Sequence, residues 1–385
     1  MGLTKRDEFL PLSRPEISEA EIKAVTACLR SGWITTGPRT AEFEKAFAQR
    51  VDAPQAVAVS SATAGLHLLL HALGIGPGDE VITSPFTFAS TVNMIALLGA
   101  KPVFADIDYH SLMMRPELVR EKITEKTRAI IPVHIAGAPF DLDPLCELAR
   151  EKGIKVVDDA AHALGVVYKG RPVGSHPHPA VFSFQATKNI TSAEGGMITL
   201  HDQELAARLR RLRFHGLERA SAWERETQGR GPHYDIHDPG FKYNLPDVLS
   251  ALGMVQLERL DEINGRRRRL AEAYLVGLEG VDGLDLPFRG KEGEVHGWHL
   301  FIIKVKSMPR EEFMFRLKEY NIGTGLHFPP CHLLSYVQER YGYKQGDFPE
   351  CEKAAKRIVS LPLFPGMSEE DVEYVCAAVK EVLEG

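Results

Sequence analysis

The stretch FSFQATKNIT (residues 182–191) begins with the alternation of apolar and small residues that is typical of a buried strand. Lys188 follows where the chain should leave that strand, and the loop-forming TSAEGG (191–196) comes directly after it. A lysine at the carboxyl edge of a buried sheet is partly desolvated, which disfavours its charged form and makes the neutral, nucleophilic amine accessible. The stretch therefore predicts a strand that presents an amine to a ligand, or a lysine that simply extends to solvent.

Short β-branched runs alternate with helix-length segments on both sides of this stretch. The clearest runs are DEVITSP (79–85), KPVFADI (101–107), RAIIPVHIAG (128–137) and KVVDD (155–159). Strands separated by helical crossovers pair mostly in parallel and place helices on both faces of the sheet. The sequence thus predicts an α/β fold with a mostly parallel central sheet, and ligands bind such sheets beyond the carboxyl ends of the strands.

A change of pattern in the last third of the chain predicts a second, smaller unit. A long helical segment at about residues 245–280 leads into WHLFIIKV (298–305) and a final helix, SEEDVEYVCAAVKEVL (368–383). A chain of 385 residues is long enough for two domains. We expect a large α/β domain at 1–255, including an N-terminal segment, and a small C-terminal α+β domain at 256–385.

Composition excludes several classes of partner. The formal charge of −6 gives no general attraction for nucleic acid or anionic membranes. The one basic run, Arg266–Arg269, lies in a helical stretch and is interpreted as a solvated helix face rather than a phosphate-binding patch. No apolar segment reaches the ~18–20 residues that span a bilayer, and no secretory signal is recognisable. The five cysteines are widely spaced and never form a CxxC pair, so we expect reduced, mostly packing thiols and a cytoplasmic location.

Two consecutive carboxylates end a second predicted strand. In KVVDDAAHALG (155–165), Asp158 and Asp159 should lie at the same sheet edge as Lys188, and His162 follows three positions later. Either aspartate can cap a following helix. With two in a row, one can cap while the other faces a ligand. A carboxylate that faces the protonated ring nitrogen of pyridoxal phosphate (PLP) keeps that ring an electron sink.

Two further strand ends add an anion site and an aromatic side chain. In SSATAGLHLLL (60–70), a strand ends in serines, and Ala62 and Thr63 open a helix whose N–H groups can bind an anion. A hydroxyl there can equally be an ordinary helix cap. In TSPFTFAST (83–91), an aromatic residue such as Phe88 can stack on a flat ring, although an isolated aromatic is more often part of a core.

Together these stretches resemble the DegT/StrS-type nucleotide-sugar aminotransferases, which are PLP-dependent enzymes of the aspartate aminotransferase fold (fold type I). The likeness runs from FLPLSRP (9–15) to SLPLFPGM (360–367) and so covers almost the whole chain. Its most specific signal is the lysine at the strand end followed by Glu-Gly-Gly. The resemblance implies PLP as the cofactor and no metal.

The resemblance also implies roles for individual residues. Lys188 matches the lysine that holds the cofactor covalently, and Asp159 matches the carboxylate paired with the pyridine nitrogen. His162 lies where the family has His or Gln near the phenolic oxygen of the ring, and Phe88 matches the stacking aromatic. The positions that match phosphate contacts are Ala62, Thr63, Ser183 and Asn244. The family supplies the asparagine from a neighbouring subunit, which implies a homodimer with shared active sites.

The implied reaction moves an amino group from L-glutamate to a keto carbon, C4, of a UDP- or dTDP-linked sugar, for aminosugars of cell-envelope polysaccharide or lipid A. The residues that we expect near the substrate are Trp33, Thr36, His299 and His327. The chain departs from the family pattern at Asp158, where Glu is commoner, and after Phe328, where Pro329 and Pro330 replace an expected basic residue. Dehydratases of the family have histidine in place of the lysine, so Lys188 favours amino transfer over that alternative.

Other functional classes fit the sequence less well. A nicotinamide dehydrogenase needs its glycines between a strand and a helix, whereas LGIGPGDE (73–80) places them between a helix and the next strand. A metal hydrolase needs clustered ligands, and the pairs His176/His178 and His296/His299 are more typical of polar loop or strand residues. A non-catalytic regulatory protein of the same fold remains an alternative, because fold does not fix function.

Overall fold

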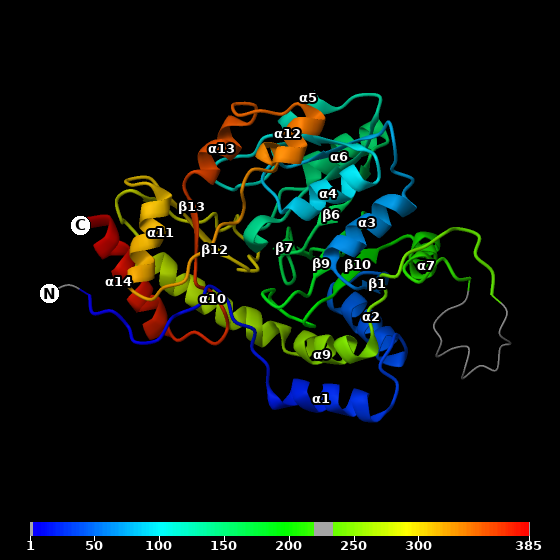
Figure 1. Ribbon diagram of the computed structural model, residues 1–385, viewed down its shortest axis with the longest axis horizontal. Coiled ribbons are helices and arrows are strands. Elements are labelled where there is room, and N and C mark those ends of the chain that lie inside the picture. Colours follow the sequence, from blue (N-terminus) through cyan, green and yellow to red (C-terminus); the bar gives the residue numbers. More distant parts are fainter. Residues whose placement is uncertain (1–2, 219–233, 385) are drawn as a thin grey trace.

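The computed structural model of the chain describes residues 3–218 and 234–384, and two four-stranded sheets lie at its centre (Figure 1). The first has the order β3-β2-β4-β5 and the second β1-β10-β9-β6. Their strands are β1 (Gln55–Val59), β2 (Glu80–Thr83), β3 (Lys101–Phe104), β4 (Thr127–Ile131), β5 (Lys155–Val156), β6 (Asp158–Asp159), β9 (Ala180–Ser183) and β10 (Gly196–Leu200). A bridge between Val133 and Asp159 joins the two into one continuous sheet. It is mostly parallel, as predicted, and β10 runs antiparallel to both of its neighbours.

Helices cover both faces of this sheet. They are α2 (Pro38–Arg50), α3 (Ala62–Ala72), α4 (Ala89–Leu97), α5 (Pro116–Lys122), α6 (Asp143–Lys152) and α7 (Gln203–Leu212). Consecutive residues of β9 show how the faces divide, because side chains alternate along a strand. Val181 packs in the core with Leu69 of α3, whereas the ring of Phe182 lies 5.2 Å from that of Phe47 of α2. The apolar run of β9 is therefore buried on both sides.

The sheet brings three predicted site segments to one edge. β1, β6 and β9 run in the same direction, so Ser61, Asp159 and Ser183 lie near their carboxyl ends, and the antiparallel β10 begins there at Gly196. A Cβ atom at Gly196 would lie 2.7 Å from the backbone nitrogen of Ala62. The glycine thus allows the N-terminus of α3 to approach the sheet edge closely.

The C-terminal part is built on a second, antiparallel sheet. The predicted long helix is confirmed as two helices with a break at Arg259, α9 (Asp247–Glu258) and α10 (Leu260–Gly277). The sheet consists of β11 (Leu284–Asp285), β12 (Phe301–Val305) and β13 (Ile358–Leu361), and α11 (Arg310–Glu319) and α14 (Glu369–Glu384) pack with it and with α10. The boundary at residues 255/256 falls within α9 and stays a prediction.

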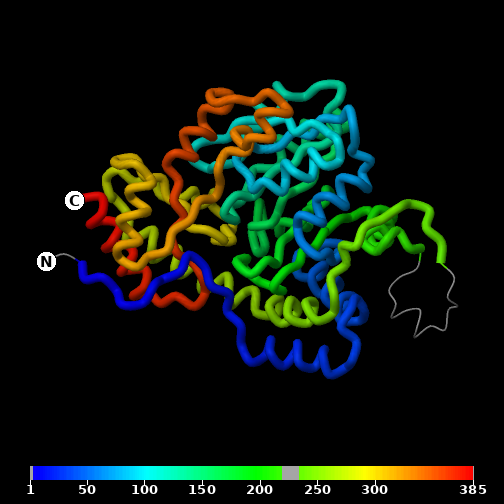
Figure 2. The backbone as a smooth tube through the Cα atoms, in the orientation of Figure 1, coloured from blue at the N-terminus to red at the C-terminus, as the bar shows by residue number. Residues whose placement is uncertain are grey.

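Smaller elements tie the two parts together. They are the hairpin β7 (Val167–Tyr168) and β8 (Arg171–Pro172), the 3-10 turns η1 (Ile135–Gly137) and η2 (Cys331–Leu333), and the helices α1 (Glu19–Arg30), α12 (Ser335–Tyr341) and α13 (Pro349–Ala355). α1 begins with a capping box between Ser18 and Glu21 and lies along α9. The N-terminal segment pairs with the C-terminal part through Leu10 and Ile322, and both ends of the chain lie on the same side of the molecule (Figure 2). Within the described residues, every helix is too short or too polar to cross a bilayer.

Candidate active site

A cavity of about 390 Å³ lies at the carboxyl edge of the sheet. It brings together most of the site residues that the sequence predicts. Those that line it are Ala62, Thr63, Phe88, Asp159, His162, Ser183, Lys188, His299 and His327. The amine of Lys188 and the carboxylate of Asp159, which are 29 positions apart in the sequence, therefore face one space.

Lys188 sits in a turn that follows β9. Its backbone N–H donates to the carbonyl oxygen of Gln185 at 2.9 Å, which turns the chain back toward the cavity. The side chain is half-buried. Burial lowers the pKa of Lys188 to about 8, although the negative charge of Asp159 opposes the shift. A substantial fraction of the amine is therefore neutral near physiological pH.

Asp159 is buried at the end of β6 and is held by two hydrogen bonds. The hydroxyl of Thr91 donates to Oδ2 at 2.6 Å, and the backbone N–H of Ala161 donates to Oδ1 at 3.2 Å. Burial raises the pKa of Asp159, while these hydrogen bonds and the charge of Lys188 act in the opposite direction. A cation placed beside this carboxylate would favour its ionised form. No sequence pattern predicts this role for Thr91, which lies within α4, 68 positions away in the chain.

Asp158 points away from the cavity, because successive residues of a strand face opposite sides. It is fully buried, and its Oδ2 lies 3.0 Å from Nε2 of His178 and 3.4 Å from Nε2 of His134. The following segment 160–165 forms turns, so the prediction of a capped helix there is wrong. Among the residues that the structure describes, no group of three or more His, Cys, Asp or Glu is arranged to bind a metal.

The N-terminus of α3 forms the second polar end of the cavity. Ser61 is the cap, since its Oγ accepts a hydrogen bond of 3.0 Å from the N–H of Ala64. The N–H groups of Ala62 and Thr63 belong to the first turn, where a helix offers no internal partner. Ser183 adds a hydroxyl from the end of β9. This end of the cavity is suited to a phosphate.

Aromatic side chains form a wall between these two ends. Phe88 lines the cavity and is 59% exposed, whereas Phe86, two positions earlier in the same stretch, is fully buried. The Phe88 ring lies 5.7 Å from the ring of Phe328, which also lines the cavity. Phe88 is thus available to pack against a planar ligand.

Two neutral histidines complete the wall. His162 lies 4.2 Å from His299 between ring centroids, and burial together with the charge of Lys188 holds the pKa of each well below its usual value. Nδ1 of His162 accepts a hydrogen bond from the N–H of Ala136 at 3.3 Å. A neutral ring that accepts at Nδ1 carries its proton on Nε2, so His162 can donate a hydrogen bond from that atom.

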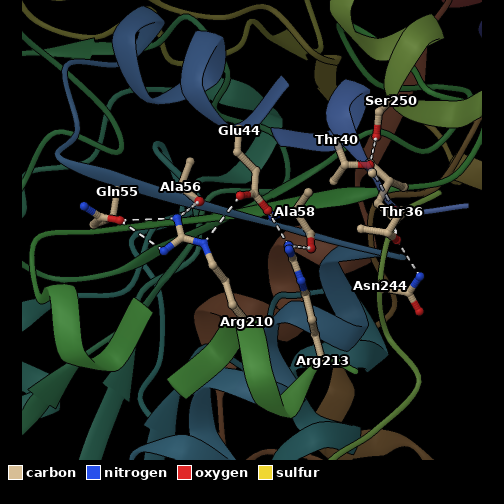
Figure 3. Close-up of polar contacts among 12 residues, drawn as sticks. Thr36, Thr40, Glu44, Gln55, Ala56, Ala58, Arg210, Arg213, Asn244 and Ser250 are labelled. Atoms are coloured by element: carbon tan, nitrogen blue, oxygen red, sulfur yellow. Dashed lines mark hydrogen bonds and ion pairs between the residues drawn. The ribbon is translucent and has the colours of Figure 1, made fainter. Parts of the chain in front are cut away.

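Three predicted residues lie outside this cavity. Trp33, Thr36 and Asn244 belong to the loops before α2 and α9, and Figure 3 shows the last two. The amide nitrogen of Asn244 donates to Oγ1 of Thr36 at 2.6 Å, and Lys242 Nζ donates to the amide oxygen at 2.7 Å. These contacts orient Asn244, which does not line the cavity of its own chain, and its role stays a prediction.

The basic run Arg266–Arg269 is the predicted solvated helix face only in part, since Arg268 and Arg269 are exposed but one of the four arginines is not. Arg266 remains near the surface in ion pairs with two glutamates, but Arg267 is fully buried. Its Nη1 donates to the carbonyl oxygens of Leu363 at 2.9 Å and His299 at 3.2 Å, and burial lowers its pKa to about 10. Arg267 therefore holds the backbone carbonyl of His299, which lines the cavity. The sequence indicates only that Arg267 lies in a helix, and this role does not follow from that.

The residues present fit PLP at each of its parts. The cavity offers an amine of lowered pKa for the aldehyde, a buried carboxylate for the ring nitrogen, an exposed aromatic face for the ring and a helix N-terminus for the phosphate. The close approach at Gly196 shapes the phosphate end, because any side chain there would displace the first turn of α3.

Comparisons with known proteins agree with this geometry. Residues 15–380 match the model of the DegT/DnrJ/EryC1/StrS aminotransferase family. The UDP-4-amino-4-deoxy-L-arabinose--oxoglutarate aminotransferase of Shewanella sediminis is 49% identical over 98% of this chain and 99% of its own length. The spore coat polysaccharide biosynthesis protein SpsC of Bacillus subtilis is 46% identical over 99% of both chains.

Solved structures show the same fold. The sugar aminotransferase Spr1654 of Streptococcus pneumoniae, in its pyridoxamine phosphate form, superposes with a TM-score of 0.92 at 35% identity, over 97% of this chain and 99% of that one. The same protein has also been solved in its PLP form. The predicted fold class, sugar aminotransferase activity and PLP dependence are confirmed, and the chain belongs to the DegT/DnrJ/EryC1/StrS aminotransferase family.

Proposed function

We propose that this enzyme transfers an amino group from L-glutamate to the C4 keto carbon of a UDP- or dTDP-linked sugar, with Lys188 and Asp159 as its catalytic residues. The observation that carries the assignment is that these two side chains, one with a lowered pKa and one buried, line the same cavity. The product would serve cell-envelope polysaccharide or lipid A modification. The names of the relatives from Shewanella sediminis and Bacillus subtilis support that use.

Lys188 has two tasks in this proposal. It would hold the cofactor, and its free amine would take the proton from the α-carbon of the amino donor. When bound, PLP supplies the electron sink for the pair left on that carbon. The lowered pKa of Lys188, to about 8, suits a general base that works near neutral pH. The same amine can return the proton, and in the second half-reaction it acts at the sugar carbon.

Asp159 and its neighbours set the charge of the site. Its carboxylate holds a proton on the ring nitrogen, and the hydrogen bond from Thr91 keeps Oδ2 in place. His162 donates from Nε2 toward the phenolic oxygen of the ring. The N–H groups of Ala62 and Thr63, with the hydroxyl of Ser183, hold the phosphate.

The wall of the cavity next to Lys188 is the proposed determinant of which sugar binds. His299, His327 and Phe328 line the cavity next to the amine, and both histidines are uncharged near pH 7, since burial lowers the pKa of His327 to about 4 and holds that of His299 well below its usual value. Nδ1 of His327 is 2.8 Å from the hydroxyl of Ser360, which fixes the ring. Neutral imidazoles suit the hydroxyl groups of a sugar, and Pro330 ends the segment where a basic residue was expected.

The active unit is proposed to be a homodimer in which Asn244 binds the phosphate in the partner's cavity. Two features support this. Asn244 is oriented by Thr36 but does not line the cavity of its own chain, and large apolar side chains are exposed on and around α1. These are Ile17, Ile22, Leu29 and Ile34, which are 44%, 51%, 54% and 50% exposed.

Complementation tests the shared site. Lys188→Ala and Asn244→Ala variants, each inactive alone, are mixed and allowed to exchange subunits. A mixed dimer contains one site with both residues intact, so activity should return to roughly a quarter of the wild-type value in a statistical mixture. If Asn244 acts within its own chain, mixing restores nothing.

A half-reaction panel tests the chemistry. L-glutamate should bleach the absorbance of the PLP-loaded protein, and each candidate UDP- or dTDP-linked 4-keto sugar is then added in turn. Recovery of absorbance with one sugar identifies the acceptor. Bleaching by glutamate without recovery on any keto sugar would contradict the proposed acceptor, and an absence of bleaching would contradict the proposed donor.

A further inference from the structure

A second cavity, of about 580 Å³, lies at the opposite edge of the sheet from the active site. Its walls include the start of β5 at Lys155, the end of β10 at Leu200, Cys146 of α6 and His178 of the segment before β9. β5 and β9 begin at this edge of the sheet, whereas the active site lies at the edge where the parallel strands end. None of these residues has a role in the proposed aminotransferase reaction.

Three side chains in this region have the arrangement of an activated thiol. Sγ of Cys146 is 3.6 Å from Nδ1 of His178, and Nε2 of the same ring is 3.0 Å from Oδ2 of Asp158. The histidine thus bridges a sulfur and a carboxylate through its two nitrogens. The carboxylate is fully buried, and the histidine is largely buried. This order of groups is the one that activates thiol nucleophiles elsewhere.

The bridging ring carries a charge. Burial alone would lower the pKa of His178, but the charge of Asp158 outweighs it and raises the pKa to about 10. His176, whose ring stacks on that of His178 at 5.5 Å, shows the opposite shift, to about 4, because of burial and the neighbouring charge. An imidazolium donates from both nitrogens. His178 therefore directs one N–H to the carboxylate and the other to the sulfur of Cys146.

The remaining cysteines of the chain differ from Cys146. Each is buried, and burial raises its thiol pKa, whereas Cys146 is only partly buried and lines a cavity. These four are Cys28, Cys331, Cys351 and Cys376. Buried thiols with raised pKa values are inert, while an accessible thiol next to a cationic histidine is the usual setting of a reactive one.

The same carboxylate connects this cluster with the active site. Oδ2 of Asp158 also contacts Nε2 of His134 at 3.4 Å, and His134 lines the active-site cavity. The backbone N–H of His134 donates to the carbonyl oxygen of Asp159 at 3.1 Å. A change at His178 would leave Asp158 with a single long contact and so act directly on a residue adjacent to the catalytic carboxylate.

We propose that Cys146 is a covalent modification site for small electrophiles, activated by His178 and Asp158, and that its modification is transmitted to the active site through Asp158 and His134. With hydrogen peroxide, the sulfur forms an S–O bond as the O–O bond breaks. The Nδ1–H of His178 protonates the departing oxygen, which leaves as water, and the imidazole takes up the thiol proton. The sulfur is oxidised by two electrons and the peroxide is reduced by two.

Alkylation of the PLP-loaded enzyme with iodoacetamide at pH 7 tests whether His178 and Asp158 activate Cys146. Mass spectrometry follows each of the five cysteine-containing peptides over time. Cys146 should react at least about tenfold faster than the other four thiols, which serve as internal controls, and His178→Gln should slow it by about tenfold. Because that variant leaves Asp158 with only its 3.4 Å contact to His134, the double variant Asp158→Asn/His178→Gln is measured as well. Equal rates in wild type and both variants would overturn the proposed activation.

The proposed transmission from Cys146 to the active site is tested on the modified enzyme. After stoichiometric treatment with hydrogen peroxide or iodoacetamide, the wild type should lose at least about half of its kcat. Cys146→Ser treated in parallel should keep its activity, which excludes damage at other residues. Full activity of an enzyme shown by mass spectrometry to be modified at Cys146 would overturn the proposed transmission.

Discussion

The hydroxyl of Thr91 donates a 2.6 Å hydrogen bond to Oδ2 of Asp159, so a residue of α4 orients the carboxylate that we place against the ring nitrogen of the cofactor. Thr91 is fully buried, and its hydroxyl also contacts that of Thr87 at 3.1 Å. The carboxylate is therefore held by a chain of hydroxyl groups on one side, while its other oxygen accepts from the backbone of Ala161.

Replacement of Thr91 should lower activity while the cofactor still binds. A hydrogen bond to a charged group is worth about 1.5–3 kcal/mol, so Thr91→Val should reduce kcat/KM by roughly ten- to a hundredfold. Thr91→Ser, which keeps the hydroxyl, should retain most of the activity. Steady-state kinetics with glutamate measure both variants. Equal activity of the Val and Ser variants would show that the hydrogen bond does not support Asp159.

The amine of Lys188 should titrate near pH 8 in the cofactor-free protein. Its pKa is lowered from 10.5, so the protonated form is lost as the pH rises through 8 rather than through 10.5. Limited acetylation with acetic anhydride, followed on the peptide that contains Lys188, should therefore show its midpoint near 8. Asp159→Asn should move the midpoint lower still, because the charge of Asp159 raises this pKa. A midpoint near 10 would show that the amine is not desolvated.

A methyl group at residue 196 should damage the phosphate end of the site. The Cβ of Gly196→Ala would lie 2.6 Å from the backbone carbon of Ser61, so the first turn of α3 must move. Affinity for PLP should fall by about tenfold or more, because the N–H groups of that turn bind the phosphate. Gly76→Ala, where a Cβ meets nothing within 4 Å, is the matched control. Unchanged PLP affinity in the first variant would contradict the assigned phosphate site.

A buried ion pair behind the sheet should contribute to stability. Glu44 of α2 lies between the guanidinium groups of Arg210 and Arg213 and accepts from the N–H of Ala58 at 2.9 Å (Figure 3). Glu44→Gln leaves two cations without their partner and should lower the free energy of unfolding by about 3 kcal/mol. Glu42→Gln, in an exposed pair with an arginine, should cost less than about 1 kcal/mol. Similar urea midpoints for both variants would refute this distinction.

Much of the architecture follows from local patterns. The alternation of β-branched runs and helical stretches predicts the parallel sheet, and the sheet then brings strand-end residues such as Lys188 and Asp159 to one edge. The resemblance to the family adds the cofactor and the individual roles. The break at Arg259 was not predicted, because both α9 and α10 have ordinary helical spacing and no proline separates them.

Contacts between distant segments could not be predicted. Thr91 and Arg267 each reach the site through one side chain, from helices whose pattern encodes only which face is buried. Asp158 illustrates the same limit, since strand alternation places it opposite Asp159 but does not reveal His178 or His134 as its partners. Such pairings depend on the packing of the whole fold, which one sequence does not display.

The identity of the residue that holds the cofactor is the most direct test of the account. The PLP-loaded protein is reduced with borohydride, digested and analysed by mass spectrometry for the peptide that carries the pyridoxyl group. The account predicts the label on Lys188 and its loss in Lys188→Ala. A label on another lysine, or amino transfer by Lys188→Ala at the wild-type rate, would contradict it.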